Sequence, residues 1–456
     1  MLVNELGRFV SQTRYDTLPA DVVEAVKLRI LDVIGAGFVG FHLGSHKTLL
    51  RTLGGAPEAT VWGEGRKISL RDAVIINSFL AHAAYLDDGS RHTGGHPSSA
   101  VIPSACAFAE SNHASGGALI AAVAAGYEIF LRLGRAIYPS TVNRGFQSTA
   151  VLGAVSAAAA CANLERLDAV AAKNALAIAC SLGVGLKEAL KSSSSQPLQV
   201  GRSCEGGVLA ALYAREGAQG ADSIIENGFM RAFSDAATPA GAADDLGTRF
   251  SIFETYIKVH GGCRGNHAPV DVLQDLVKAH AITADAVDRI RMQVDSVTYA
   301  AEIHDPRDGN QAQFSVAFAM AVALLEGNAS MFQYTDANVA DPRVRALMSK
   351  IHVEVNKALD ENYPDKRGAI AEIVLTNGER YRRAIENAKG EPEYPLATAD
   401  VEQKFLSLTG DIIGKRRAQR IRDMVMTVER LDDAASLAAQ LEAGASAKRA
   451  GQQHAA

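Results

Sequence analysis

The chain has 456 residues, of which 48% are hydrophobic and 21% are charged, and its formal net charge is −5. This composition is typical of a soluble globular protein, and the length predicts two domains. A slightly acidic chain does not supply the basic surface that nucleic-acid binding requires, and no apolar run reaches the roughly 18–20 residues of a membrane span, so we expect neither partner.

The first 265 residues have helical spacing of apolar side chains almost throughout. Several segments are unusually rich in alanine and glycine. Because small residues let helix axes approach closely, we expect a tightly packed and largely buried helical array. Pro19 falls at a first helical turn, and further helices are predicted at 71–84, 117–134, 149–163, 167–190, 203–215 and 222–232.

The pattern changes after about residue 285. Asn377 and Gly378 separate two strand-like runs, and this dipeptide favours the type I′ turn of a β-hairpin. These features predict a smaller α+β unit with a mainly antiparallel sheet. Its other expected elements are strands at 290–294 and 351–355, which alternate apolar and polar residues, and helices at 314–325 and 342–350.

Helical spacing returns from 400 to 441, and we expect this segment to pack back on the first domain. The predicted fold class is therefore mainly α, with a large discontinuous all-helical domain and a smaller α+β domain. The predicted division is a helical domain at 1–265, an α+β lid domain at 266–395, a C-terminal return of the helical domain at 396–445 and a mobile tail at 446–456.

The densest group of reactive side chains lies in the segment 81–110. It comprises two carboxylates, an arginine and two histidines: Asp87, Asp88, Arg91, His92 and His96. Glycines and a proline surround them, and an apolar helical run follows at once. Acids, imidazoles and a guanidinium on such a loop are what proton transfer on an anionic substrate requires. The alternative is a polar loop whose charges only pair with one another.

Two other polar segments precede predicted helices. Gln147 lies in the segment 143–149, which could present helix N–H groups to an anion or could serve only as a helix cap. We expect residues 192–202 to form a polar loop, and Arg202 at its end could bind a substrate carboxylate through its guanidinium. The serine run in this segment is alternatively a flexible connector.

A further segment, 258–269, is a glycine-rich bend before a predicted helix. Its reactive side chains are Lys258, His260, Cys263, Arg264 and His267. The helix dipole and the positive charges would together favour a bound carboxylate. His260, Cys263 and His267 have the chemistry of metal ligands, but their spacing matches no standard zinc pattern, and we expect no metal.

The sequence lacks the motifs of the common cofactor sites. It has no G-x-G-x-x-G after a strand, no P-loop, no G-x-S-x-G and no H-E-x-x-H, so we expect chemistry without an organic cofactor. The five cysteines are scattered without a C-x-x-C pair, which favours a reducing compartment. The first residues do not have the pattern of a signal peptide, and the predicted location is the cytoplasm.

Five segments occur in a characteristic order. LRILDVIGAGFVG near the N-terminus is followed by ATVWGEGRKISLRDAVIINSFLAHAAYLDDG, HPSSAVIPSACAFAE, PLQVGRSCEGGVLAALYA and QAQFSVAFAMAVALLEG. With these segments the chain resembles the MmgE/PrpD family over nearly its whole length. That family includes 2-methylcitrate dehydratase, cis-aconitate decarboxylase and iminodisuccinate epimerase.

The resemblance implies a large helical domain made from both ends of the chain, a smaller α+β lid, and a homodimer that needs no organic cofactor. It also implies an active site in the cleft between the domains. The family positions that line it correspond to Asp87, Asp88, His96 and Lys258. Tyr299 aligns with a family tyrosine that could donate a proton from the opposite face.

The chain also departs from the family pattern. Gln147 stands where dehydratase-like and decarboxylase-like members carry the histidine of a G-F-H segment. Gln196 and Gln199 stand where those members have the lysine and histidine of K-P-L-H. Glutamine can hydrogen-bond a substrate oxygen, but it does not titrate near neutral pH. These replacements argue against the standard dehydratase and decarboxylase activities, and the first loop looks closer to the epimerase-like branch.

We therefore predict an enzyme that moves a proton at a carbon α to a carboxylate of a small di- or tricarboxylate, as iminodisuccinate epimerase does. The alternatives are a hydro-lyase of the 2-methylcitrate dehydratase type, a cis-aconitate decarboxylase-like lyase, or a non-catalytic carboxylate-binding protein. His96, oriented by Asp87 or Asp88, would be the acid and base, and Lys258 would stabilise developing negative charge. The predicted substrate contacts are Arg91, His92, Gln147, Gln196, Gln199, Arg202, Cys263, Arg264 and His267.

Overall fold

A computed structural model describes residues 1–192 and 194–442. The chain folds as two compact units, one made of residues 1–255 with the segment from 397 onward, and one made of 256–396. Residues 256–265, which the sequence-based division placed in the helical domain, therefore belong to the second unit. The predicted tail 446–456 lies outside the described residues.

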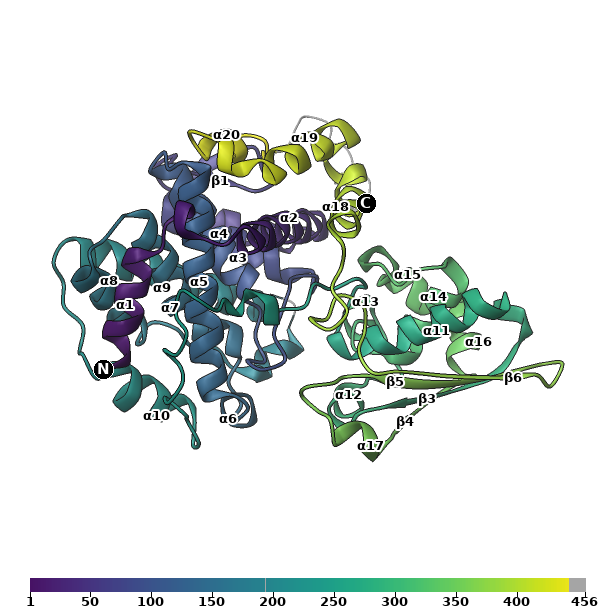
Figure 1. The fold of residues 1–456 in the computed structure, drawn as a ribbon. Helices are drawn as coiled ribbons and strands as arrows, with labels where there is room; N and C mark the ends of the chain where they lie inside the picture. The colour runs from purple at the N-terminus through teal and green to yellow at the C-terminus, as the bar shows by residue number, and fades with distance from the viewer. Residues whose placement is uncertain (193, 443–456) are drawn as a thin grey trace. The chain divides into compact units, whose positions relative to one another are not determined.

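The first unit is a helical array in which α7 packs against α4, α5, α8 and α9, and α3 packs against α2, α4 and α9. Figure 1 shows α18 and α19 beside α2, so the C-terminal segment completes this unit. Its elements are α1 (Leu2–Gln12), α2 (Ala20–Leu43), β1 (Ala59–Val61), β2 (Arg66–Ile68), α3 (Leu70–Ala83), α4 (Pro97–Ser111), α5 (Gly116–Ile137), α6 (Ser140–Asn143), α7 (Ser148–Leu164), α8 (Ala169–Ala179), α9 (Ser195–Arg215), α10 (Arg231–Phe233), α18 (Thr398–Ile413), α19 (Lys415–Met426) and α20 (Ala435–Ala438).

Glycines allow these helices to approach one another closely. A Cβ on Gly40 of α2 would lie 2.1 Å from the carbonyl oxygen of Leu80 in α3. A Cβ on Gly201 of α9 would lie 2.3 Å from the carbonyl oxygen of Ile75, also in α3. No side chain fits at these distances, so the small residues set the spacing of the array.

The helix α5, which the sequence predicted at 117–134, is a long apolar element. By length and composition it is the one helix in the described part of the chain that could cross a membrane. However, 94% of its most apolar window is buried inside the structure. Burial of this extent is that of a core helix, which is apolar on every side because other helices surround it.

Two predicted helix boundaries are wrong. The helix α9 begins at Ser195 and not near residue 203, because a proline is tolerated in a first helical turn and Pro197 therefore does not prevent helix formation. The expected polar loop over 192–202 is thus mostly helical. The helix α8 ends at Ala179, eleven residues before its predicted end, and Gly183 in the following turn approaches the backbone of α7.

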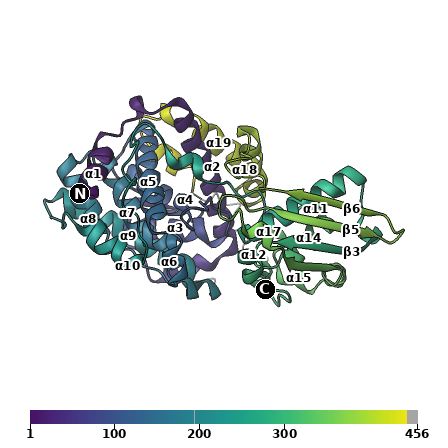
Figure 2. The ribbon, with the colours of Figure 1, turned by 60° about the horizontal axis from the view of Figure 1, so that its bottom comes forward.

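The second unit contains a four-stranded sheet in the order β4-β3-β5-β6. β3 pairs parallel with β4 and antiparallel with β5, and β5 pairs antiparallel with β6. Figure 2 shows β3, β5 and β6 side by side, and α11 packs against β5 and β6. The elements are α11 (His267–His280), β3 (Val287–Val294), α12 (Ser296–Ala301), α13 (Gly309–Ala312), α14 (Val316–Glu326), α15 (Asp336–Ala340), α16 (Pro342–Met348), β4 (Ile351–Val355), α17 (Lys357–Asp360), β5 (Ala369–Leu375) and β6 (Arg380–Ile385).

The β5–β6 turn differs from the predicted type I′ turn. Gly378 has a φ of 90°, but Asn377 does not have a positive φ. The N–H of Gly378 donates to the carbonyl of Leu375 over 2.9 Å. This is a type I turn followed by a left-handed glycine, which is another common hairpin connection. The fold class itself, mainly α with a smaller and mainly antiparallel α+β unit, is confirmed.

Candidate active site

The candidate site in the helical unit is built on the loop between α3 and α4. The loop closes on itself because the N–H of Ser90 donates to the carbonyl of Gly95 over 3.0 Å. Gly94 has a φ of 60°, and a Cβ there would lie 2.9 Å from the ring of Tyr138. Glycine is therefore required at this turn. The turn places His96 directly before the first residue of α4.

Asp87 lies between two histidines. Its Oδ2 accepts a hydrogen bond from Nδ1 of His82, at 2.6 Å. Its Oδ1 lies 3.7 Å from Nδ1 of His96. The rings of His82 and His96 are arranged edge to face with centroids 5.2 Å apart. The structure therefore groups two imidazoles around one buried carboxylate.

The carboxylate of Asp88 does not face His96, and its hydrogen bonds hold helices of the fold together. Its Oδ1 accepts the N–H of Ser98 at 2.9 Å, which caps the first turn of α4, and its Oδ2 accepts the hydroxyl of Tyr127 at 2.9 Å. Burial of the carboxyl raises the pKa of Asp88 to about 6, although these hydrogen bonds oppose the shift. Asp87, and not Asp88, is the carboxylate that faces His96.

His96 has the orientation of a general acid and base. Its Nδ1 donates to the carbonyl oxygen of Asp88 over 2.5 Å, so we assign the proton of the neutral ring to Nδ1 and the lone pair to Nε2. About 22% of its side chain is exposed. By contrast, the His82 side chain is 2% exposed. Of these two imidazoles, His96 is the one that solvent or a substrate can reach.

Two predicted residues from distant helices complete the cluster. Gln147 is the residue before α7, and Gln196 lies in the first turn of α9. Their side-chain nitrogens lie 3.3 Å and 2.6 Å from Nε2 of His82. Sequence analysis named both glutamines but did not single out His82. The available signal was a histidine at the end of a predicted helix, five residues before an acidic pair.

A half-buried cation from the C-terminal segment supports the loop. Lys404 of α18 lies 2.6 Å from Oδ1 of Asp32 in α2, and it donates to the carbonyl of Leu86 over 3.4 Å. Burial raises the pKa of Asp32, and the charge of Lys404 opposes this shift. The residue next to Asp87 is thus held by a helix from the other end of the chain.

Other predicted contacts of the helical unit lie elsewhere. Arg202 is paired with Glu205, which Arg71 also contacts, and its side chain is 60% exposed. It lines a separate surface hollow, because six residues after Gln196 a helical side chain has turned by roughly 120°. Gln199 bonds to the backbone of Leu186. These contacts lie apart from the loop cluster, and the role of Arg202 and Gln199 as substrate contacts stays a prediction.

Arg91 and His92 remain on the loop itself. Arg91 is buried, with 8% of its surface exposed. The backbone N–H of His92 donates to the hydroxyl of Ser90 over 3.3 Å, and the His92 ring is partly exposed.

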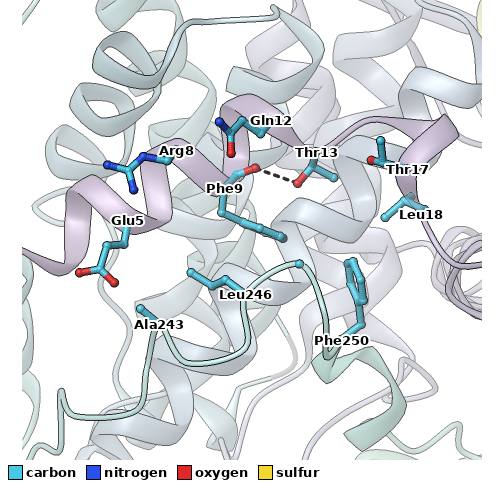
Figure 3. Close-up of a pocket in the computed structure, with 11 residues that line it drawn as sticks. Glu5, Arg8, Phe9, Gln12, Thr13, Thr17, Leu18, Ala243, Leu246 and Phe250 are labelled. Atoms are coloured by element: carbon cyan, nitrogen blue, oxygen red, sulfur yellow. Dashed lines mark hydrogen bonds between the residues drawn. The ribbon is translucent and has the colours of Figure 1, made fainter.

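Figure 3 shows a different hollow, which lies between α1 and residues 243–250. Its volume is about 350 Å³. None of the predicted site residues lines that hollow.

The remaining predicted residues belong to the second unit. Lys258 is buried, with 2% of its surface exposed. Arg264 is buried against Glu391 and lies over the ring of Tyr256, 4.6 Å from its centroid. The backbone N–H of Cys263 donates to the carbonyl of Gln313 over 2.8 Å. These contacts place three of the predicted residues within one well-packed bend.

The histidines of this bend do not form a ligand set with Cys263. His260 pairs with Asp271 over 2.9 Å, and the His267 ring lies 5.4 Å from that of His260 at the start of α11. Across residues 1–192 and 194–442, no group of three or more histidine, cysteine or acidic side chains could hold a metal ion. Tyr299 lies on α12 and is 37% exposed.

Comparison with known proteins agrees with the fold. The sequence model of the MmgE/PrpD N-terminal domain matches residues 4–241, and that of the MmgE/PrpD C-terminal domain matches residues 260–430. A cis-aconitate decarboxylase of Aspergillus terreus is 27% identical over 465 residues, which cover 96% of this chain and 95% of that protein.

Relatives from other organisms have similar descriptions. The human cis-aconitate decarboxylase is 26% identical over 445 residues, covering 92% of this chain and 90% of that protein. The cis-aconitate decarboxylase-like protein oryM of Aspergillus oryzae is 26% identical over 466 residues, which cover 95% of this chain and 96% of that protein. The two domain matches together span most of the sequence. The resemblance is therefore confirmed, and the chain belongs to the MmgE/PrpD family of enzymes.

Proposed function

We propose that this protein is a cofactor-independent lyase that acts on a small unsaturated polycarboxylate in the manner of cis-aconitate decarboxylase. Its main support is similarity to cis-aconitate decarboxylases over more than nine tenths of the chain. The geometry of His96, with Nδ1 bonded and a partly exposed ring, fits a proton donor in that reaction. The epimerase predicted from the sequence becomes the second candidate.

The proposed reaction needs one proton. The bond between carbon and the departing carboxylate breaks, CO₂ leaves, and the electron pair moves through the adjacent double bond. The carbon at the far end of that double bond then takes a proton from Nε2 of the His96 imidazolium. The carboxylate of Asp87, 3.7 Å from Nδ1, stabilises the imidazolium before the transfer. Solvent afterwards returns a proton to His96.

One observation favours the epimerase candidate. Gln147 and Gln196 bring neutral amides to His82, at positions where related decarboxylase-like sequences are expected to carry titratable groups. Glutamine does not titrate, so these two positions supply no acid or base for loss of a carboxylate. An exposed imidazole beside a carboxylate can still serve as the base of a proton exchange.

The two candidates and a non-catalytic binder give different results in one experiment. The protein is incubated in D₂O with cis-aconitate, 2-methylcitrate or iminodisuccinate, and the mixtures are followed by NMR. A decarboxylase releases CO₂ and places one deuterium in its product. An epimerase exchanges the α-proton without releasing CO₂. A binder changes none of the acids and only raises the melting temperature. Absence of CO₂ release from cis-aconitate contradicts the lyase proposal for that substrate.

The role of His96 is tested in the same assay. His96→Gln is expected to reduce turnover roughly 10²–10⁴-fold, which is typical for loss of a general acid or base. His113→Gln is the control, because that histidine is 75% exposed and pairs with Asp433 away from the loop. Turnover near the unmodified level in His96→Gln would reject the assignment. The role of Lys258 as a substrate-binding cation stays a prediction.

A further inference from the structure

The main chain of His96 and its ring are held by different contacts. The backbone N–H of His96 donates to Oγ1 of Thr149, in the first turn of α7, over 3.1 Å. This bond, and the start of α4 at the next residue, fix the main chain. The imidazole could still rotate about the two side-chain bonds. A hydrogen bond of 2.5 Å from Nδ1 to the backbone carbonyl of Asp88 opposes that rotation.

The orientation of the His96 ring therefore depends on where the Asp88 carbonyl lies. The side chain of Asp88 is held at both carboxylate oxygens. Oδ1 accepts the N–H of Ser98 in α4, and Oδ2 accepts the hydroxyl of Tyr127 in α5, each over 2.9 Å. Because these donors belong to two different helices, the short Asp88 side chain has little freedom. The same two anchors therefore restrict the backbone of Asp88, including its carbonyl.

Asp88 and Tyr127 are too deep in the helical unit to reach a substrate. The exposed fraction of each is 0%. Neither residue takes part in the proton transfer proposed above. Their hydrogen bonds nevertheless end at the acceptor that the His96 ring uses, and residues that support a reactive side chain in this way determine how accurately it is placed.

We infer that Tyr127 is a positioning residue, which holds Asp88 so that the Asp88 carbonyl orients the His96 imidazole with its proton on Nδ1. In this arrangement Asp88 acts on His96 through its backbone, and its carboxylate serves as a hydrogen-bond acceptor for two helices. The sequence-based expectation that a carboxylate of the pair orients His96 is thereby refined for Asp88. The inference rests on the proposed function only for the part that His96 plays in turnover.

The first test observes the His96 ring directly. The full-length chain is labelled with ¹⁵N-histidine, and NMR detects the ring nitrogens through their couplings to carbon-bound ring protons. The signals of His96 are those missing from His96→Gln. At a pH where the ring is neutral, Nδ1 of the unmodified protein is expected to carry the proton and Nε2 to be bare.

Two variants show whether the Tyr127 hydroxyl maintains this state. Tyr127→Phe removes the hydroxyl and keeps the aromatic ring in the core. The two nitrogen shifts of His96 are expected to move toward each other, because the ring begins to exchange between its tautomers. Thr409→Val is the matched control, because it also removes a buried hydroxyl of the helical unit, one that donates to the carbonyl of Phe405. It is expected to leave the His96 shifts unchanged.

The second test measures turnover of cis-aconitate and separates positioning from acid–base chemistry. Tyr127→Phe is expected to lower kcat roughly 10-fold with little change in KM, since a displacement of about 1 Å can cost up to roughly 10²-fold. Asp88→Asn can still accept from Ser98 and can donate to the Tyr127 oxygen, so it is expected to keep most of kcat. Asp88→Ala loses both contacts and is expected to lose roughly 10²-fold.

Two results overturn the inference. One is an unchanged set of His96 ring signals in Tyr127→Phe, and this variant decides the matter should Asp88→Ala not fold. The other is an equal loss of kcat in Asp88→Asn and Asp88→Ala, which would show that the charge of the carboxylate is needed. A purely structural role of Tyr127 lowers the melting temperature of Tyr127→Phe without changing the ring signals. If the proposed function fails instead, no form of the protein turns over cis-aconitate, but the NMR response to Tyr127→Phe remains.

Discussion

The raised pKa of Asp88 predicts that the helical unit loses stability as the pH rises from about 4 to about 6. In this window the folded state still holds the proton of Asp88, whereas the carboxyl of the unfolded chain has already ionised. The folded state therefore binds more protons, and the free energy of unfolding falls with increasing pH. The loss of stability is complete above the pKa of Asp88 in the folded state and absent below its pKa in the unfolded chain.

The structure sets the size of this effect. The rise from 3.8 to about 6 is about two pKa units, which corresponds to about 3 kcal/mol. Asp88→Asn removes the ionisation but keeps an oxygen for the N–H of Ser98, and the hydroxyl oxygen of Tyr127 can accept from the new amide. We expect the variant to gain about 3 kcal/mol relative to the unmodified protein between pH 4 and pH 7.

The assay is urea unfolding at several pH values, followed by tryptophan fluorescence. Trp62 is the single tryptophan of the chain and is buried in the helical unit, so its emission reports the unit that contains Asp88. Asp433→Asn is the control, because a hydrogen bond from His113 lowers the pKa of Asp433 and its titration falls below this window. A constant difference between Asp88→Asn and the unmodified protein from pH 4 to pH 7 would refute the reasoning.

Two further predictions concern the packing of the helical unit. Lys404→Met leaves the buried carboxyl of Asp32 without its cation and is expected to lower the free energy of unfolding by about 3–5 kcal/mol, whereas the same change in an Asp32→Asn background costs much less. Equal losses in both backgrounds, measured by urea unfolding, would show that the pair is not coupled. Gly40→Ala introduces a Cβ 2.1 Å from a backbone oxygen and is expected to cost about 1–3 kcal/mol. Gly54→Ala, with no atom within 4 Å of its Cβ, is the control and is expected to change the melting temperature little.

The sequence predicted the elements whose signal is local. Alanine-rich runs gave the positions of α5 and α7 to within a few residues, and alternation gave β3 and β4. The start of α9 was missed because serine, proline and glutamine are common in loops, while the burial of Gln196 that stabilises this first turn comes from other helices. The predicted turn geometry at Asn377 was also wrong, because an Asn-Gly dipeptide is compatible with more than one hairpin connection.

Site residues were predictable only where the chain itself brings them together. Asp87 and His96 are on one loop, so their proximity follows from sequence. His82 contacts residues 65 and 114 positions away, and no local pattern links an apolar helix end to two such distant glutamines. Arg202 was expected near the start of a helix, but α9 begins seven residues earlier, at Ser195, so Arg202 lies inside the helix and pairs with Glu205.

The pairing of Lys404 with Asp32 has a consequence for how the protein is made. The two residues are 372 positions apart, so at about 5–20 residues per second a ribosome adds Lys404 roughly 20–70 s after Asp32. Throughout that interval the nascent helices lack the cation that compensates this acid. The loop between α3 and α4 therefore acquires this support only after α18 has been synthesised, and a chain released before α18 would be exposed to chaperones and proteases instead of maturing.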